Sequence, residues 1–312
     1  MTAEEALQLF KDYLIVERDR SQHTVRAYTS DVREFMEFVS RSGIDLFEVE
    51  HTDLRAFFAE ITGAGMHNGH ARKRKLDARS QRRKLASVRT FYSFLVLRDI
   101  MSNNPAKEIR SPRMKKKLPG FIPYEEMRTL LEDGPDRQGN LAAERKIRDT
   151  ALMEILYSSG MRISEALSLD VMNESEDLTQ LKILGKGRRE RIIFLGDSAR
   201  AALVRYLKVR DQFRPATQKL FVNRDGGPLS DRGVRKIMVE LQRASGLQRR
   251  VHPHRFRHSM ATDLLNEGAD IRAVQELLGH RSLASTQVYT GVSKDRLKEV
   301  YRRSHPHGRS LD

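Results

Sequence analysis

Apolar residues recur at helical spacing through the first third of the chain. They form two main runs: Val25, Tyr28, Val32, Phe35, Met36 and Val39, and then Leu85, Val88, Phe91, Tyr92 and Leu95. Positions three and four apart lie on one face of a helix, so each run predicts an amphipathic helix with a buried face. The pattern predicts an all-helical first domain over residues 1–108.

This periodicity stops between residues 104 and 126, where four prolines, a glycine and a basic run occur together. Such a composition is typical of a segment between domains, and we predict a linker over 109–121. A second domain is then expected over 122–312. Pro123 and the acidic pair that follows Tyr124 suit the first turn of a helix.

The second domain is predicted to be mostly helical, with one exception over residues 181–196. Apolar residues alternate at Leu181 and Ile183 and again at Ile192 and Phe194, with glycines between the two runs. This is the pattern of a β-hairpin, and it places Lys186 at the tip of the turn. The expected fold class is therefore mainly α: a helical N-terminal domain and a mixed, mostly helical second domain with a small antiparallel hairpin.

The net charge of the chain indicates the kind of partner that the protein binds. Of 312 residues, 57 are Lys or Arg and 42 are Asp or Glu, a formal net charge of +15. A surface this basic attracts polyanions, and we expect double-stranded DNA before an acidic membrane, since no apolar run approaches the roughly 18 residues of a spanning helix. The start, "MTAEEALQLF", lacks the features of an export signal, so we expect a cytoplasmic protein.

Several kinds of chemistry have no support in the sequence. The chain has no cysteine, which rules out disulfides, thiol nucleophiles and cysteine-based metal sites. It also lacks a GxxxxGK[ST] loop and a GxGxxG turn, so nothing indicates nucleotide hydrolysis or dinucleotide chemistry.

Basic residues concentrate in the first domain over 72–89, where nine Lys or Arg accompany one acidic residue. A solvated helix face is the simpler interpretation of a charge run, but the imbalance of sign favours contact with phosphates. The candidate DNA-contacting residues are Arg26, Arg82, Arg83 and Arg89.

Histidines and arginines that could take part in catalysis or ligand binding occur close together in the sequence of the second domain. In "VHPHRFRHSMATDLLNEG", residues 251–268, His254, Arg257 and His258 share one side of a predicted helix. Two alternatives stay open for this side: histidines with core hydrogen bonds, and a metal site, which the intervening arginine disfavours by charge repulsion.

Three further positions could join this chemistry. Arg162 stands at the mouth of a helix after a glycine turn, where it could instead simply pair with Glu165. His280 follows Gly279, the predicted end of a helix, and Tyr289 comes nine positions later. Such a tyrosine usually packs, and it becomes a nucleophile only where neighbouring cations favour the phenolate. Arg162 and His280, together with Lys186, His254 and Arg257, form a set of donors suited to clamping a pentavalent phosphorane while a side-chain oxygen attacks.

Four segments carry a resemblance to a known family. "GMRISEALSL", "GKGRRER", "HRFRHSMATDLL" and "LGHRSLASTQVYT" resemble, in order and spacing, the signature boxes of the tyrosine site-specific recombinases, especially the bacterial Xer chromosome-dimer resolvases. The resemblance covers nearly the whole chain, and the first domain is similar to the family's helical core-binding (SAM-like) domain.

The resemblance implies a role for each candidate. Tyr289 would attack a scissile phosphate to leave a 3'-phosphotyrosine and a free 5'-hydroxyl, and Arg162 and Arg257 would hold the non-bridging oxygens. Lys186 would be the general acid for the departing 5'-oxygen. His254 would assist proton transfer and His280 would hydrogen-bond the phosphoryl group. No metal or cofactor is implied.

The resemblance also implies partners. Four protomers, identical or of two kinds, would act on two DNA sites, with a second Xer recombinase and an FtsK-like DNA translocase as further candidates. The tail over 292–312 would dock on a neighbouring protomer, unless it folds back on its own domain. Dimer resolution at a dif-like site during cell division is the expected role. The alternatives are a phage, transposon or integron integrase, a relaxing topoisomerase, a non-catalytic DNA-binding relative and a metal-dependent nuclease.

Overall fold

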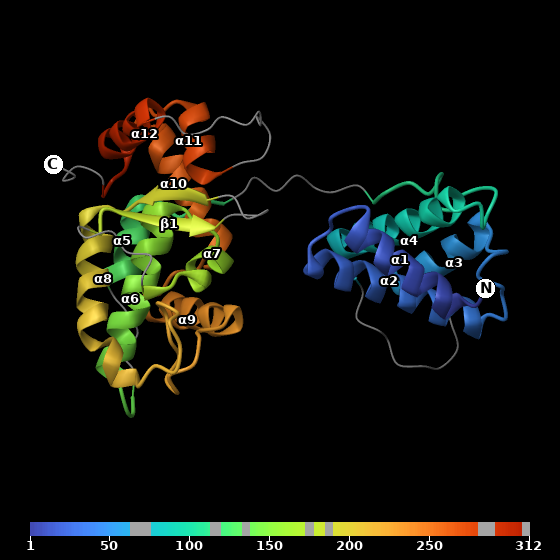
Figure 1. Cartoon of the computed structure of the whole chain (residues 1–312), viewed down its shortest axis with the longest axis horizontal. Coiled ribbons are helices and arrows are strands. Elements are labelled where there is room, and N and C mark those ends of the chain that lie inside the picture. The colour runs from blue at the N-terminus through green and yellow to red at the C-terminus, as the bar shows by residue number, and fades with distance from the viewer. Residues whose placement is uncertain are drawn as a thin grey trace. The chain divides into compact units, whose positions relative to one another are not determined.

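The computed structural model describes residues 1–62, 76–112, 120–132, 138–171, 178–184, 190–279 and 291–307. The chain divides into two compact units, Met1–Lys117 and Leu118–Asp312 (Figure 1). None of the described helices combines the length and the apolar character needed to cross a bilayer.

Helices make up the first unit, as the periodicity predicted. Its described helices are α1 (Ala3–Val16), α2 (Gln22–Arg41), α3 (His51–Thr62) and α4 (Ala78–Leu97). Side chains cap three of their N-termini: Thr2 before α1, Ser21 before α2 and Asp77 before α4 each accept a hydrogen bond from a backbone N–H of the first turn. These caps satisfy donors that a helix start leaves unpaired, so they locate the three starts in the sequence.

An aromatic core holds these helices together. Phe10 of α1 meets Phe91 of α4 edge to face at 5.3 Å, and Phe35 of α2 meets Phe57 of α3 in the same way at 5.1 Å. Tyr92 is fully buried, and its hydroxyl donates to the Leu46 carbonyl at 3.1 Å. Edge-to-face pairs add to the stabilisation from burial, so this core fixes the mutual packing of the four helices.

The second unit is also mainly helical and is built around α6 (Ala142–Ser159). Every residue from Ala151 to Ser159 is buried, as expected for a helix covered on all sides. The other elements are α5 (Tyr124–Glu132), α7 (Ile163–Ser168), β1 (Gln180–Leu184), β2 (Glu190–Phe194), α8 (Asp197–Arg210), the 3-10 helix η2 (Asp211–Phe213), α9 (Asp231–Ala244), α10 (Pro253–Asn266), α11 (Ile271–Leu278) and α12 (Gly291–Ser304). Both α8 and α10 pack directly against α6.

The predicted hairpin is confirmed by the antiparallel pair of β1 and β2, but its inward face differs from the prediction. Leu181 pairs with Ile193, and Ile183 pairs with Arg191. All four of these side chains are buried, whereas Ile192 is only partly buried. The apolar alternation is misleading because an arginine occupies an inward position and because Phe194 is also buried, with its ring 6.0 Å from the ring of Tyr301 on α12.

Residues 291–307 pack on their own unit. The Tyr301 hydroxyl and Ser158 Oγ of α6 are hydrogen-bonded at 2.5 Å, and Ser158 Oγ also accepts from the Gly196 N–H at 2.9 Å. A Cβ at Gly196 would lie 2.0 Å from the carbonyl oxygen of His307, so only glycine permits this approach. Docking of the tail on a neighbouring protomer stays a prediction.

His305 closes this contact as a neutral side chain. It is 1% exposed and stacks on Tyr301 at 4.6 Å, and its Nδ1 accepts the backbone N–H of His307 at 3.0 Å. Burial, with a smaller contribution from His307, lowers the pKa of His305 from 6.5 to about 3. An imidazole that accepts at Nδ1 cannot be protonated there without loss of this bond.

Acid should therefore weaken the packing of α12. The His305 contribution is complete above pH 6.5 and is lost as the pH falls from 6.5 towards 3, because the unfolded chain then binds a proton that the folded chain does not. Between pH 7.5 and 5.5 we expect a loss of about 1.4 kcal/mol of unfolding free energy from this group. Urea unfolding of the wild type, His305→Asn and the exposed-site control His23→Asn at both pH values measures it.

The Asn variant keeps an acceptor for the His307 N–H but cannot titrate. Its unfolding free energy should thus depend less on pH in this window than that of the wild type or of the His23 variant. Equal pH dependence in all three proteins would contradict the assignment of His305 as a buried neutral side chain.

Candidate active site and DNA-facing surface

A turn that begins at a glycine presents Arg162. Gly160 ends α6 with φ +58°, and Arg162 is the N-cap of α7 two residues later. A Cβ at Gly160 would lie 2.8 Å from a methyl carbon of Leu278 and 3.0 Å from the sulfur of Met260. Glycine is therefore favoured by the backbone conformation, and its lack of a Cβ leaves room for the Leu278 and Met260 side chains against the turn. The turn leaves the Arg162 side chain 42% exposed.

Glu165, in the first turn of α7, holds Arg162 in place. Its Oε2 accepts the Arg162 backbone N–H at 2.7 Å, and its Oε1 accepts from Arg162 Nη1 at 2.9 Å. Arg191 of β2 donates to the same two oxygens, at 3.1 and 2.9 Å. Burial alone would raise the pKa of Glu165, but the backbone hydrogen bond and the charges of Arg191 and Arg162 outweigh it, so the pKa lies below its usual value.

Arg257 of α10 reaches the same region from another direction. It is 9% exposed, its Nη1 donates to the Gly160 carbonyl at 2.6 Å, and its Nη2 donates to the Leu278 carbonyl. These carbonyls end α6 and α11, where the helix dipole favours a cation. Burial, and then the charges of Arg162 and Arg191, lower the pKa of Arg257 to about 10, so it remains charged at neutral pH.

The cluster of Arg162, Arg191, Arg257 and Glu165 therefore has three positive charges and one negative charge. Each Nη of Arg257 carries a second N–H beyond the one given to a carbonyl. A partly buried site with excess positive charge and oriented donors is suited to an anion with several oxygens, such as a phosphate.

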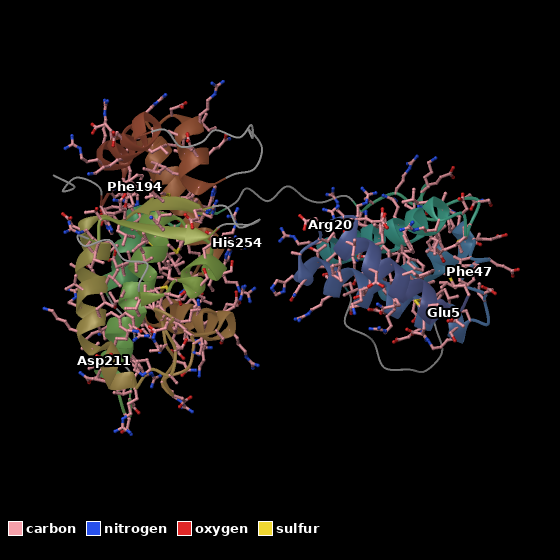
Figure 2. The ribbon with its side chains drawn as sticks, in the orientation of Figure 1. Glu5, Arg20, Phe47, Phe194, Asp211 and His254 are labelled. Atoms are coloured by element: carbon pink, nitrogen blue, oxygen red, sulfur yellow. The ribbon has the colours of Figure 1, made fainter. Side chains whose placement is uncertain are left out.

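Of the other predicted active-site residues, the structure describes His254 and not Lys186, His280 or Tyr289. His254 lies exposed in the first turn of α10, on the element that carries Arg257 (Figure 2). Lys186, His280 and Tyr289 lie outside the described residues. The elements beside them are described: β1 and β2 flank Lys186, α11 ends before His280, and α12 begins after Tyr289. Within the described ranges, no three His, Asp or Glu side chains gather as metal ligands.

Sequence reasoning missed Arg191 and treated Glu165 only as a competing partner for Arg162. The structure shows that this pairing exists and that it orients Arg162 without covering it. A signal for Glu165 was available, because a glutamate three residues after a helix N-cap often bonds back to it. Arg191 had no comparable signal, since a charged residue in a hairpin is usually exposed.

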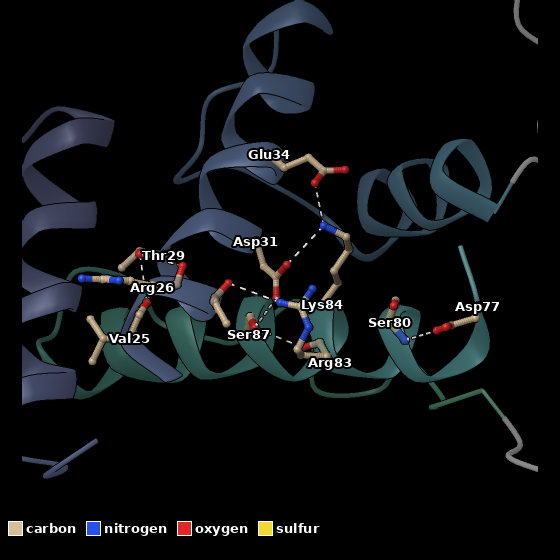
Figure 3. Close-up of polar contacts among 11 residues, drawn as sticks. Val25, Arg26, Thr29, Asp31, Glu34, Asp77, Ser80, Arg83, Lys84 and Ser87 are labelled. Atoms are coloured by element: carbon tan, nitrogen blue, oxygen red, sulfur yellow. Dashed lines mark hydrogen bonds and ion pairs between the residues drawn. The ribbon is translucent and has the colours of Figure 1, made fainter. Parts of the chain in front are cut away.

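In the first unit, a buried carboxylate joins α2 to α4 and determines which cations remain available. Asp31 accepts from Lys84 at 3.2 Å, from Ser87 at 2.8 Å and also from Arg83 (Figure 3). Lys84 additionally bonds Glu34 at 2.6 Å. Arg83, a predicted DNA contact, is thus paired within the protein, although its side chain is still 43% exposed.

The remaining predicted DNA contacts fall into two groups. Arg89 donates to two backbone carbonyls, those of Ala106 at 3.1 Å and Ile109 at 2.6 Å, so it supports the segment after α4. Arg26 on α2 and Arg82 on α4 are exposed, and their side chains make no hydrogen bond or ion pair with any residue that the structure describes. These two have free donors for a polyanion.

Comparison with known proteins places the chain in a family. Residues 122–296 match the Phage integrase family, and residues 7–99 match Phage integrase, N-terminal SAM-like domain. The chain is 42% identical to tyrosine recombinase XerC of Leptospira interrogans over 305 residues, covering 98% of this chain and 94% of the relative. It is 37% identical to tyrosine recombinase XerC of Bacillus subtilis over 306 residues, covering 96% of each chain.

A solved structure has a similar fold. The XerH site-specific recombinase, bound to a palindromic difH substrate in a post-cleavage complex, matches with a TM-score of 0.69 and 24% sequence identity. The match covers 94% of this chain and 83% of that chain.

The two groups of arginines should respond differently to truncation. Arg82→Ala should weaken DNA binding and reduce the slope of log affinity against log salt by about one, because one phosphate contact is lost. Arg89→Ala should instead lower the unfolding free energy by about 1 to 3 kcal/mol, because two carbonyls lose their donor. Fluorescence anisotropy over a salt series, with urea unfolding of the same proteins, separates the effects; an unchanged slope for Arg82→Ala would remove it from the DNA surface.

Proposed function

The chain belongs to the phage integrase family and is a Xer-type site-specific tyrosine recombinase, and from this premise we propose that six of its residues form the active site. They are Arg162, Lys186, His254, Arg257, His280 and Tyr289. The observation that carries the proposal is the cluster at the ends of α6 and α11, where Arg162 and Arg257 are held beside one carboxylate with an excess of positive charge. We further propose residues 1–108 as the core-binding domain, 109–121 as the linker and 122–312 as the catalytic domain.

The reaction exchanges one phosphodiester for another. The Tyr289 oxygen attacks the scissile phosphorus, the bond from phosphorus to the 5'-oxygen breaks, and a 3'-phosphotyrosine and a 5'-hydroxyl remain. Lys186 donates the proton that the departing 5'-oxygen takes up, while His254 assists proton transfer and His280 hydrogen-bonds the phosphoryl group. Because the tyrosyl link keeps the energy of the phosphodiester, a 5'-hydroxyl can reverse the step without nucleotide hydrolysis.

The two arginines act on the charge that develops during attack. Arg162 and Arg257 donate to the non-bridging oxygens of the phosphorane, whose negative charge offsets the positive excess of the cluster. The same field favours the phenolate of Tyr289, since a phenol with a pKa near 10 is otherwise a poor nucleophile. Arg257 needs no reorganisation to do this, because helix-end carbonyls already hold its guanidinium.

The partner is double-stranded DNA, bound as two recombination sites by four protomers. The biological substrate we propose is a dif-like site at which chromosome or plasmid dimers are resolved during cell division. A second Xer recombinase and an FtsK-like DNA translocase are the protein partners that this role suggests. The tail over 292–312, whose described part packs on its own unit in this structure, would contact a neighbouring protomer only in the assembly on DNA. Support for a Xer-type role comes from the relatives named tyrosine recombinase XerC, which match over nearly the full length.

A nicked suicide substrate tests the chemistry directly. The wild type should form a covalent protein–DNA adduct on a candidate dif-like site in the presence of chelator, and Tyr289→Phe should form none. Denaturing electrophoresis detects the adduct. Tyr206→Phe, a buried tyrosine of the same unit, is the matched control and should retain adduct formation.

The outcomes separate the alternatives. An adduct that persists in Tyr289→Phe would exclude that residue as nucleophile, and cleavage that chelator abolishes would indicate a metal-dependent nuclease. DNA binding without any adduct would indicate a non-catalytic relative.

Exchange between two sites tests the biological role. A plasmid with two directly repeated dif-like sites should be resolved into two circles by the wild type and not by Tyr289→Phe, as gel analysis of the products would show. Relaxation of supercoils without resolution would indicate a topoisomerase. Recombination only between dissimilar attachment sites would indicate an integrase.

A further inference from the structure

Arg191 is buried in a position where the hairpin pattern calls for an apolar residue. It lies on β2 opposite Ile183, and its side chain is only 8% exposed. Burial of a guanidinium carries a large desolvation cost unless hydrogen bonds and an opposite charge compensate it. Glu165 supplies that compensation through a two-pronged pair at 3.1 and 2.9 Å. A charge held inside at this cost suggests a role beyond filling space.

The Arg191 guanidinium touches a second element as well. A Cβ at Gly279 would lie 2.6 Å from Arg191 Nη1 and 3.1 Å from its Cζ, so the guanidinium lies against the backbone at the end of α11. Gly279 has φ +66°, a conformation in which glycine is favoured, and it is the last described residue before His280. Arg191 therefore packs where the chain leaves α11.

One side chain thus joins three elements, and each adjoins a residue of the proposed active site. β2 begins after Lys186, α7 begins after Arg162, and α11 ends before His280. Glu165 transmits the contact to Arg162, because the same carboxylate receives both guanidinium groups. Without Arg191, Arg162 would be the only described cation bonded to Glu165.

We propose that Arg191 is a positioning residue for DNA cleavage: it stays buried, away from the phosphate, and holds α7 and the end of α11 in register with the hairpin through Glu165 and Gly279. The inference rests on the proposed function. Only arginine suits the task, because its planar fork satisfies both carboxylate oxygens while a lysine provides a single point charge.

The main test separates reaction rate from binding. Arg191→Lys keeps the charge and loses the two-pronged geometry, so single-turnover adduct formation on the suicide substrate should slow by about tenfold to a hundredfold, the range expected for misplaced catalytic groups. The DNA concentration for half-maximal rate should change by less than about threefold, since Arg191 does not contact DNA. Glu165→Gln should slow the reaction, and the double variant should be no slower than the slower single variant, because both act through one contact.

A matched control removes general destabilisation as an explanation. Arg210 is also 8% exposed, and it donates to the carbonyls of Thr217, Lys219 and Leu220. The next residue, Asp211, lies at the opposite end of this unit from Phe194 of the hairpin (Figure 2). Arg210→Lys should lower the unfolding free energy to a similar or greater extent while adduct formation stays near the wild-type rate.

Hydrogen exchange without DNA tests the Arg191 junction, that is, its contacts with Glu165 and Gly279, independently of activity. Arg191→Lys should speed amide exchange at Arg162 and in the last turn of α11, and Arg210→Lys should change neither region. Unchanged exchange in Arg191→Lys, or adduct formation at the wild-type rate, would overturn the inference. If the wild type forms no adduct at all, the proposed function fails and this catalytic role fails with it, whereas the exchange data still report whether the junction exists.

Discussion

The candidate site of the second unit depends on one interaction, the pairing of the Glu165 carboxylate with the guanidinium groups of Arg162 and Arg191. Three guanidinium groups, those of Arg162, Arg191 and Arg257, lie in one region and repel one another, and within the described part of the cluster Glu165 supplies the negative charge. The carbonyls at the ends of α6 and α11 supply the remaining compensation through Arg257. The charges can stay together because two of the three compensating partners are helix ends, whose dipoles favour a cation.

This arrangement leaves a positive excess that the protein does not neutralise. If every arginine of the cluster were neutralised within the protein, the site would attract a phosphate only weakly. If Glu165 were absent, repulsion between the guanidinium groups would push them apart. The structure lies between these limits, because Arg162 donates from Nη1 to Glu165 while its side chain remains 42% exposed. Preorganisation of this kind favours a transition state with added negative charge, because the donors are already oriented before the charge develops.

The same division applies to the basic residues of the first unit. A net charge of +15 does not mean that every cation faces a ligand. Arg83 and Lys84 bond Asp31, and Arg89 bonds two carbonyls, so these side chains join helices and support a loop. Arg26 and Arg82 are the candidates of the predicted set that are exposed and whose side chains make no bond within the described part of the chain. Internal pairs therefore join the helices, and a smaller number of free cations is left to contact a polyanion.

The segment proposed to carry the nucleophile runs between two anchored helices. Arg257 and Arg191 hold the end of α11, and the Tyr301 contact with Ser158 holds α12, so the chain from Gly279 to Gly291 has both ends attached to one unit. Sequence separation alone gives no indication of this second anchor. The buried histidine at position 305 extends it to the last described residues of the chain.

The sequence by itself determined the helical character of both units, the hairpin, the preference for a polyanionic partner and the family. Periodicity, charge and motif spacing can all be read along the chain without knowledge of its tertiary contacts. It also identified Arg162 and Arg257 as members of one site. Only the tertiary structure decided that Arg191 points inward, that Arg83 and Arg89 are committed to internal bonds, and that α12 packs on its own unit. These are long-range contacts: Arg191 meets a carboxylate 26 residues away and Arg83 one 52 residues away, and no local pattern specifies such a partner.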